Sequence, residues 1–215
     1  MNQRPPVTTA LVVANVIAFV FQLGTNGALT RWGLLLGPAI EFGEWWRVVT
    51  GGFLHASLLH IGFNMYALWI FGPTLEKGVG AVRFSLIYAA GLFGSSLAVL
   101  LFDFNQQTLG ASGAVLGLAG GLAAVLMTRG INLFQTSLGA IFLINLALPI
   151  LVPRISFWGH FGGIIGGFLA GLAVSWLPER AGVADRAATA VAAALMVGLF
   201  AASLFIGQNG SLAFG

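Results

Sequence analysis

Cysteine is absent from this 215-residue chain, and charged residues are scarce. Without a thiol, the chain has no cysteine nucleophile, no disulfide framework and no cysteine-based metal site. Charged residues make up 7% of the sequence, whereas a soluble domain usually carries about 25%. The formal charge of +3 comes from only nine basic and six acidic residues, so it gives no reason to expect a nucleic-acid partner.

Apolar residues and glycine take the place of the missing charge. Hydrophobic residues make up 58% of the sequence, more than the core of one globular domain would bury. The 31 glycines follow no collagen-like period, and membrane helices tolerate glycine because small residues let two backbones approach closely. We therefore expect an integral, multi-pass membrane protein whose solvent is largely the lipid bilayer.

The apolar residues fall into seven long segments. Each has about 17–21 residues, near the ~20 that a helix needs to cross ~30 Å of hydrocarbon. Each must be helical, because unpaired backbone groups are too costly in lipid. We predict an all-α, polytopic membrane helical bundle forming one domain over residues 1–215. The predicted spans are residues 7–23, 53–71, 84–102, 111–127, 133–152, 157–177 and 187–206.

The loops and their charges orient this bundle. The long loop at residues 24–52 holds Trp32, Trp45 and Trp46; tryptophan favours the membrane interface, so we expect the loop in the headgroup layer. With a cytoplasmic N-terminus, six basic residues lie inside and three outside, as the positive-inside rule requires. The inner residues are Arg4, Lys77, Arg83, Arg129, Arg180 and Arg186, and the outer ones are Arg31, Arg47 and Arg154.

Four polar residues then fall at a similar depth near the outer face. His60 lies near the start of the second span, and Asn64 is one turn deeper. Ser112 begins the fourth span, within a Gly-Ala-Ser-Gly run, and His160 is near the start of the sixth. We expect these three spans to meet and to bring the four side chains together.

Glycine spacing predicts which spans touch. Small residues recur at every fourth position on the fourth and sixth spans, and such ridges allow close helix pairs. Packing of the two ridges would bring Ser112 Oγ within hydrogen-bond reach of a His160 nitrogen. The ridges are Gly113, Gly117 and Gly121 on one span and Gly159, Gly163, Gly167 and Gly171 on the other.

That contact predicts nucleophilic catalysis. A serine hydroxyl attacks only when a base takes its proton, and His160 can take the proton and return it to a leaving amine. Asp103, at the outer end of the third span, is the only acid nearby, so we predict a Ser–His dyad rather than a triad. His60 and Asn64 share one helix face and, with the Ser112 N–H, can stabilise an oxyanion, each donor being worth roughly 3–4 kcal/mol.

Each of these residues also has a simpler interpretation. A serine in a membrane helix usually bonds to its own backbone, as we expect for Ser95, Ser96 and Ser175. A buried histidine such as His55 is usually structural, and Asn64 alone could serve helix packing. The agreement of depth, helix face and chemistry favours a hydrolytic site.

On these residues and several others, the chain resembles the rhomboid intramembrane serine proteases, from about the first span through the sixth. A Gly-x-Ser-Gly run alone is a weak pattern, but the whole set, in this order and on these spans, is highly specific. The matching stretches are Glu44-Trp45-Trp46-Arg47, Phe53-Leu54-His55, His60 through Asn64-Met65, Phe71-Gly72, Leu75-Glu76, Gly80, Arg83, Gly110 through Gly113, and His160 followed by Gly163 and Gly167.

The resemblance implies a fold and a set of roles. The fold has six core transmembrane helices, here residues 7–177, plus a C-terminal seventh at about 187–206. Ser112 and His160 would be the catalytic dyad, with His60 and Asn64 as oxyanion donors. The structural motif would comprise Trp46, Arg47, Gly110, Gly113, Gly163 and Gly167.

The resemblance also implies partners and location. Family substrates are single-span membrane proteins cut in or near the top of the transmembrane helix, with no metal or organic cofactor. No oligomer is required. Gating would involve Phe63 and residues 148–156. We expect a prokaryotic inner membrane, a cytoplasmic N-terminus and an active site opening to the outer side.

Two departures and two alternatives accompany this interpretation. Leu116 stands where some relatives carry a tyrosine that stacks on the histidine, and Gly159 stands where alanine is common. The main alternative is a non-proteolytic rhomboid-like protein that binds membrane clients, but such relatives lack the serine or histidine that this chain keeps. A transporter or channel would need polar lining at all depths, whereas the inner halves of these spans are almost wholly apolar.

Overall fold

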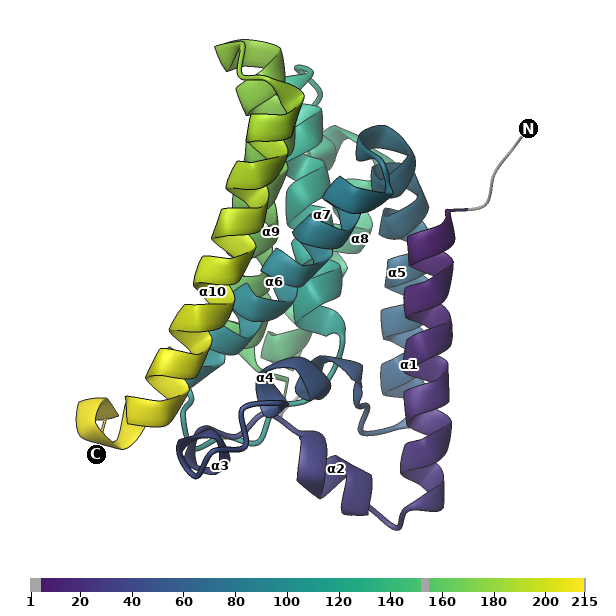
Figure 1. Ribbon diagram of the computed structural model, residues 1–215. Helices are drawn as coiled ribbons and strands as arrows, with labels where there is room; N and C mark the ends of the chain where they lie inside the picture. The colour runs from purple at the N-terminus through teal and green to yellow at the C-terminus, as the bar shows by residue number, and fades with distance from the viewer. Residues whose placement is uncertain (1–4, 152–154, 215) are drawn as a thin grey trace.

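The computed structural model describes residues 5–151 and 155–214, and this part of the chain is mostly helical (Figure 1). The all-α prediction is therefore confirmed. The elements are α1 (Pro6–Gly24), α2 (Ala28–Gly33), α3 (Gly37–Glu41), α4 (Arg47–Thr50), the 3-10 turn η1 (Gly51–Phe53), α5 (Leu58–Val79), α6 (Ala81–Phe102), α7 (Ser112–Thr128), the 3-10 turn η2 (Leu133–Gln135), α8 (Ser137–Leu151), α9 (Phe157–Ala181) and α10 (Asp185–Phe214).

Several of these helices can cross a membrane, which confirms a multi-pass protein. Within the described residues, α1, α6, α9 and the Asp185–Gly210 part of α10 are each long and apolar enough. Arg47–Phe53 and α5 qualify together, although the chain bends by 93° between them. Helix α7 has 17 residues and α8 has 15, so the count of seven crossings stays a prediction.

The second predicted span differs most from the observed helix. Residues 54–57 are not helical, and α5 begins only at Leu58, where the Ser57 hydroxyl accepts a hydrogen bond from the His60 N–H. The helix then continues to Val79 and ends at Gly80, whose φ is 84°. Its last two turns contain Glu76 and Lys77. Because the apolar segment stops before these charged residues, the sequence predicted an end at residue 71, eight residues too early.

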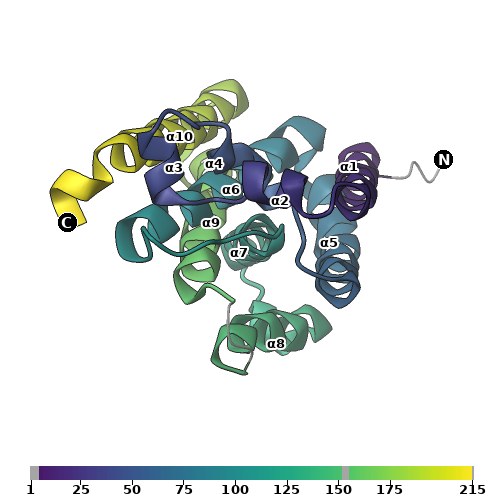
Figure 2. The same ribbon diagram turned by 90° about the horizontal axis from the view of Figure 1, so that it is seen from below.

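Helix α7 lies in the middle of the bundle (Figure 2). It packs most extensively on α9, and also contacts α6, α5 and α8. Most of its residues are buried, whereas α1 and α10 lie at the periphery and expose much of their surface. The residue that begins α7 is therefore held within the protein, at one end of the bundle.

The contact between α7 and α9 runs along the two glycine ridges that the sequence predicted. A Cβ added at Gly163 would overlap the Gly113 carbonyl, and one at Gly167 would overlap the Gly117 carbonyl. A Cβ at Gly171 would lie 2.7 Å from the Gly121 Cα. The two backbones therefore touch directly, as small-residue ridges allow.

Polar contacts fasten the end of the bundle opposite the start of α7. The buried carboxylate of Glu76, on α5, accepts hydrogen bonds from the N–H groups of Val7 and Thr8 at 2.9 and 2.8 Å, and from Thr8 Oγ1 at 2.7 Å. These are N–H groups of the first turn of α1, which have no acceptor within their own helix. Glu76 thus caps α1 and joins it to α5.

Replacing Glu76 by leucine should destabilise the protein. The change leaves the part-buried N–H of Val7 and the buried donors of Thr8 unpaired, at up to about 1–3 kcal/mol for each. The matched control is Glu179→Gln, whose half-exposed carboxylate lies 3.6 Å from Arg129, because exposed pairs contribute only ~0–1 kcal/mol. Thermal unfolding in detergent should show a lower midpoint for Glu76→Leu alone; equal midpoints would contradict the capping role.

Adding one methyl group to the α7–α9 contact should also be destabilising. Gly167→Ala forces the two backbones apart, and overpacking of this kind costs about 1–3 kcal/mol. Gly198→Ala is the control, because Gly198 lies in α10 with no atom within 4 Å of its added Cβ. The unfolding midpoint should fall for Gly167→Ala only. Equal changes in both variants would mean that the ridge contact is not tight.

Candidate active site

A small polar cavity lies where α7 begins. Its volume is about 40 Å³, enough for about three water molecules by the usual ~10–15 Å³ criterion. Its walls come from α5, α6, α7, α9 and the segments that precede α7 and α9. The lining residues are His60, Ser95, Thr108, Leu109, Gly110, Ser112, Gly113, Ile155, Ser156, Gly159 and His160.

Ser112 and His160 meet in this cavity. His160 Nε2 lies 2.9 Å from Ser112 Oγ, which is a hydrogen bond. Ser112 is the first residue of α7, and His160 is in the first turn of α9 and buried. The contact that the glycine spacing predicted is therefore present, with a base in reach of the hydroxyl proton.

The start of α9 is fixed by a short chain of hydrogen bonds. Ser156 Oγ accepts from the Gly159 N–H at 3.0 Å, which caps the helix. The same hydroxyl donates to Asp103 Oδ2 at 3.2 Å. Asp103, the only acid that the sequence places near the site, therefore holds Ser156, the N-cap residue of the helix that carries His160.

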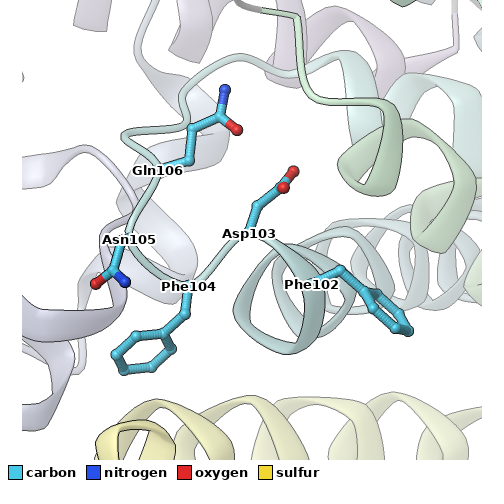
Figure 3. A pocket seen from close by; sticks show the side chains of 5 residues that line it. All are labelled: Phe102, Asp103, Phe104, Asn105 and Gln106. Carbon is cyan, nitrogen blue, oxygen red and sulfur yellow. The ribbon is translucent and has the colours of Figure 1, made fainter. Parts of the chain in front are cut away.

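Asp103 also borders a second, open hollow of about 430 Å³, lined by residues 102–106. Figure 3 shows the Asp103 carboxylate and the Gln106 side chain extending to the same side of this segment. Phe104 extends away from them, towards α10, where a Cβ added at Gly210 would overlap its ring. Phe104 thus anchors the segment, and Asp103 connects the hollow to the N-cap of α9.

His60 approaches the cavity from α5, against Gly110. A Cβ added at Gly110 would lie 2.8 Å from both Cε1 and Nε2 of His60. Gly110 also has a φ of +130°, which L side chains rarely adopt. Both features require glycine at this position, and they leave the His60 ring edge facing the cavity.

The tautomer of His60 follows from its other nitrogen. The backbone N–H of Ala56 donates to His60 Nδ1 at 3.3 Å. A backbone amide can only donate, so Nδ1 carries a lone pair and the proton of the neutral ring is on Nε2. His60 thus presents an N–H, rather than a lone pair, on the Gly110 side.

The start of α7 adds backbone donors. Its N-cap residue, Ala111, has no side-chain cap, and the first N–H groups of a helix lack intrahelical acceptors. The Ser112 N–H is one of them. A helix N-terminus of this kind favours negative charge, such as an oxyanion beside Ser112.

Asn64 and Phe63, one of the predicted gating positions, do not line the cavity. The Asn64 side-chain amide donates to the His60 carbonyl, one turn earlier on α5, at 3.0 Å, and Asn64 does not line the cavity. Phe63 is exposed on α5. Residues 152–154 of the predicted 148–156 gating segment lie outside the described residues, as do the side chains of 148–151.

The long loop between α1 and α5 supports the cavity wall. The buried Arg47 guanidinium donates to Glu44 Oε2 at 2.6 Å and to the Leu34 carbonyl at 2.7 Å. Trp46 stacks on Trp32 at 5.5 Å between centroids and donates to its carbonyl at 3.2 Å. These contacts make the loop compact around Arg47 and Trp46.

This loop is also joined to the segment that leads into α7. The N–H groups of Leu35 and Thr108 donate to each other's carbonyls at 2.8 and 3.0 Å, an isolated antiparallel bridge. The Gly110 N–H donates to the Gly51 carbonyl at 2.9 Å. The loop thereby fixes the backbone beside Ser112.

Three serines that were expected to bond to their own helix, Ser95, Ser96 and Ser175, have different surroundings. Ser175 Oγ donates to the Gly171 carbonyl at 2.7 Å, one turn earlier on α9, as predicted. The prediction for Ser96 was wrong, because its hydroxyl donates to the Val48 carbonyl at 3.0 Å and joins α6 to α4. Ser95 lines the cavity, which the sequence did not predict. Its spacing of four from Gly91, which packs on α7, was the available signal.

Leu116, one turn after Ser112, is buried in the main apolar core. Gly159 lies at the α6–α9 contact, where an added Cβ would come 3.2 Å from Ser95 Oγ and 3.3 Å from Val99. Leu116, where some relatives carry tyrosine, therefore packs in the core around α7. Gly159, where alanine is common, leaves room for the side chains of α6.

Comparison with known proteins agrees with this architecture. A family model described as the Rhomboid domain matches residues 42–177. Rhomboid protease GluP of Bacillus subtilis is 35% identical over 217 residues, covering 97% of this chain and 42% of that protein. RHOMBOID-like protein 1 of Arabidopsis thaliana is 39% identical, covering 81% of this chain and 54% of that protein.

A third relative, RHOMBOID-like protein 6, mitochondrial, also of Arabidopsis thaliana, is 36% identical over 146 residues, covering 65% of this chain and 47% of that protein. The chain thus spans about half the length of these curated relatives. The domain match covers more than half of the chain itself and includes α5, α6, α7 and most of α9. This multi-pass membrane protein therefore belongs to the rhomboid family.

Proposed function

We propose that the chain is an intramembrane serine endopeptidase. It hydrolyses peptide bonds in or near the transmembrane segment of single-span membrane proteins, by a Ser112–His160 dyad. The observation that carries the proposal is the 2.9 Å contact between Ser112 Oγ and His160 Nε2, in a polar cavity within an apolar bundle. Membership of a family whose relatives include a protein named as a rhomboid protease supports it.

The dyad accounts for the bond-breaking steps. His160 Nε2 takes the proton of Ser112 as Oγ attacks the scissile carbonyl, and the imidazolium then gives that proton to the leaving amine. A water molecule enters, loses a proton to His160 and attacks the acyl-enzyme. Ser112 then leaves with the proton from His160. No metal or organic cofactor takes part in these steps.

The oxyanion is stabilised by groups around the cavity. The Ser112 N–H and the His60 Nε2–H are the principal donors, and Asn64 is the third proposed donor. Such groups stabilise a transition state when they are already oriented before charge develops. The tautomer that the Ala56 N–H favours meets that condition for His60. The bond between the Asn64 amide and the His60 carbonyl occupies one of the two Asn64 amide hydrogens.

The proposed orientation of the chain puts the site on the outer side of the membrane. The first residues of α1 and the first residues of α7 lie at opposite ends of the bundle (Figure 1). With a cytoplasmic N-terminus, the cavity opens to the outer side of a prokaryotic inner membrane. Substrate helices reach it there, where water and hydrocarbon meet.

Replacing either member of the dyad should abolish cleavage. Ser112→Ala and His160→Ala each remove a group that forms or breaks bonds, so turnover should fall by at least about 1000-fold. The measurement is cleavage of a co-expressed model single-span substrate, and Ser85→Ala is the control, because the exposed Ser85 bonds only to the Ala81 carbonyl of its own helix.

A small fluorophosphonate probe extends this test. It should label the parent chain and fail to label Ser112→Ala. Parent-like cleavage by either dyad variant would contradict the mechanism. A parent chain that captures a single-span protein without cleaving it or reacting with the probe would instead support the non-proteolytic, client-binding function.

Gly110→Ala should slow hydrolysis by roughly 100-fold, because the new methyl group displaces the ring of an oxyanion donor. The matched control is Gly130→Ala, which also places alanine at a positive φ, +75°, but has open space around its Cβ. Both variants should lose stability in thermal unfolding, Gly110→Ala the more, but only Gly110→Ala should lose kcat in the folded protein. Equal kcat values would contradict the assignment of His60.

A further inference from the structure

A buried glutamine on α1 is connected to His60. Gln22 lies in the last turns of a helix that otherwise exposes much of its surface, yet it is only 7% exposed. Its side-chain carbonyl accepts from the His55 N–H at 2.8 Å, and its amide donates to the His55 carbonyl at 3.2 Å. The second amide hydrogen goes to Thr30 Oγ1 at 2.8 Å. Both amide hydrogens and the oxygen are therefore used.

The segment that Gln22 holds has no secondary structure of its own. Residues 54–57 connect η1 to α5 across the 93° bend. The backbone of His55 is therefore placed by a side chain 33 positions earlier in the chain. The His55 side chain is 2% exposed, and its ring packs edge-on against that of His60 at 5.1 Å between centroids.

Ala56, the next residue, connects the backbone that Gln22 holds to the His60 ring. The Ala56 N–H, which donates to His60 Nδ1 at 3.3 Å, shares a peptide unit with the His55 carbonyl that Gln22 binds. A movement of that peptide unit would lengthen the bond to Nδ1. The ring could then place its proton on Nδ1, and Nε2 would offer a lone pair to the cavity instead of an N–H.

We propose that Gln22 is a positioning residue for the reaction. By clamping the backbone of His55, it keeps the Ala56 N–H on His60 Nδ1 and so keeps His60 Nε2 as a hydrogen-bond donor to the oxyanion. This inference rests on the proposed function. It assigns to α1, which contributes no side chain to the cavity, a part in stabilising the transition state.

The test variant is Gln22→Met in the full chain, which keeps the length of the side chain and removes all three hydrogen bonds. We expect kcat to fall roughly 10- to 100-fold, with KM for a model single-span substrate unchanged. Gln22→Glu keeps the acceptor for the His55 N–H and should restore part of kcat. Asn15→Leu is the control, because this buried α1 amide donates to the Leu11 carbonyl of its own helix and also interacts with Tyr88 of α6, and neither partner lines the cavity. It should lower the unfolding midpoint and leave kcat unchanged.

A double-mutant cycle separates positioning from simple stabilisation. In a His60→Ala background, Gln22→Met should cause no further loss in the rate of fluorophosphonate labelling, because its effect passes through the missing ring. An equal loss in both backgrounds, or parental kcat in Gln22→Met, would overturn the proposal.

The tautomer gives a readout that does not depend on activity. In ¹⁵N-histidine-labelled protein, with the His60 signals assigned from the His60→Ala spectrum, the parent should hold the proton on Nε2. Gln22→Met should shift the population towards Nδ1–H. A parent with the proton on Nδ1 overturns the inference even if cleavage is observed. A parent with the expected tautomer but no cleavage or probe labelling counts against the proposed function alone.

Discussion

Direct backbone contact between α7 and α9 is the constraint on which the rest of the structure depends. Lipid supplies no hydrophobic drive for two helices to associate, so close van der Waals packing must hold them. Contacts such as Gly113 with Gly163 set both the distance and the register of the helices. Because Ser112 and His160 stand at the same end of this contact, the register also sets their separation of 2.9 Å.

The cavity depends equally on segments that are not helical. His60 is oriented by the Ala56 N–H, and the backbone at Gly110 is bound to the Gly51 carbonyl. The loop between α1 and α5 is itself held compact by the buried Arg47. The helices therefore supply Ser112 and His160, while the loops fix the groups around them, as the proposed preorganised site needs.

The sequence was sufficient for the features that repeat along a helix. Apolar segment length predicted helices, and glycine period predicted the Ser112–His160 contact. It was insufficient where a residue's partner is distant in the chain. Ser96 binds Val48 rather than its own helix, and Gln22 binds His55; neither pairing leaves a local pattern. The 93° bend before α5 was not predicted either, because the composition of an apolar segment does not indicate the direction of the helix axis.

The polar contacts at the two ends of α1 have a mechanical consequence. Glu76 binds the first turn of α1, and Gln22 binds the backbone that leads into α5. Helices α1 and α5 are thus joined at both ends, so a displacement of α5 alone would have to break these hydrogen bonds. By contrast, α8 touches α5 and α9 only lightly. Under the proposed function, a substrate helix that reaches the site from the bilayer would have to displace α1 and α5 together or pass between α5 and α8, where fewer contacts have to break.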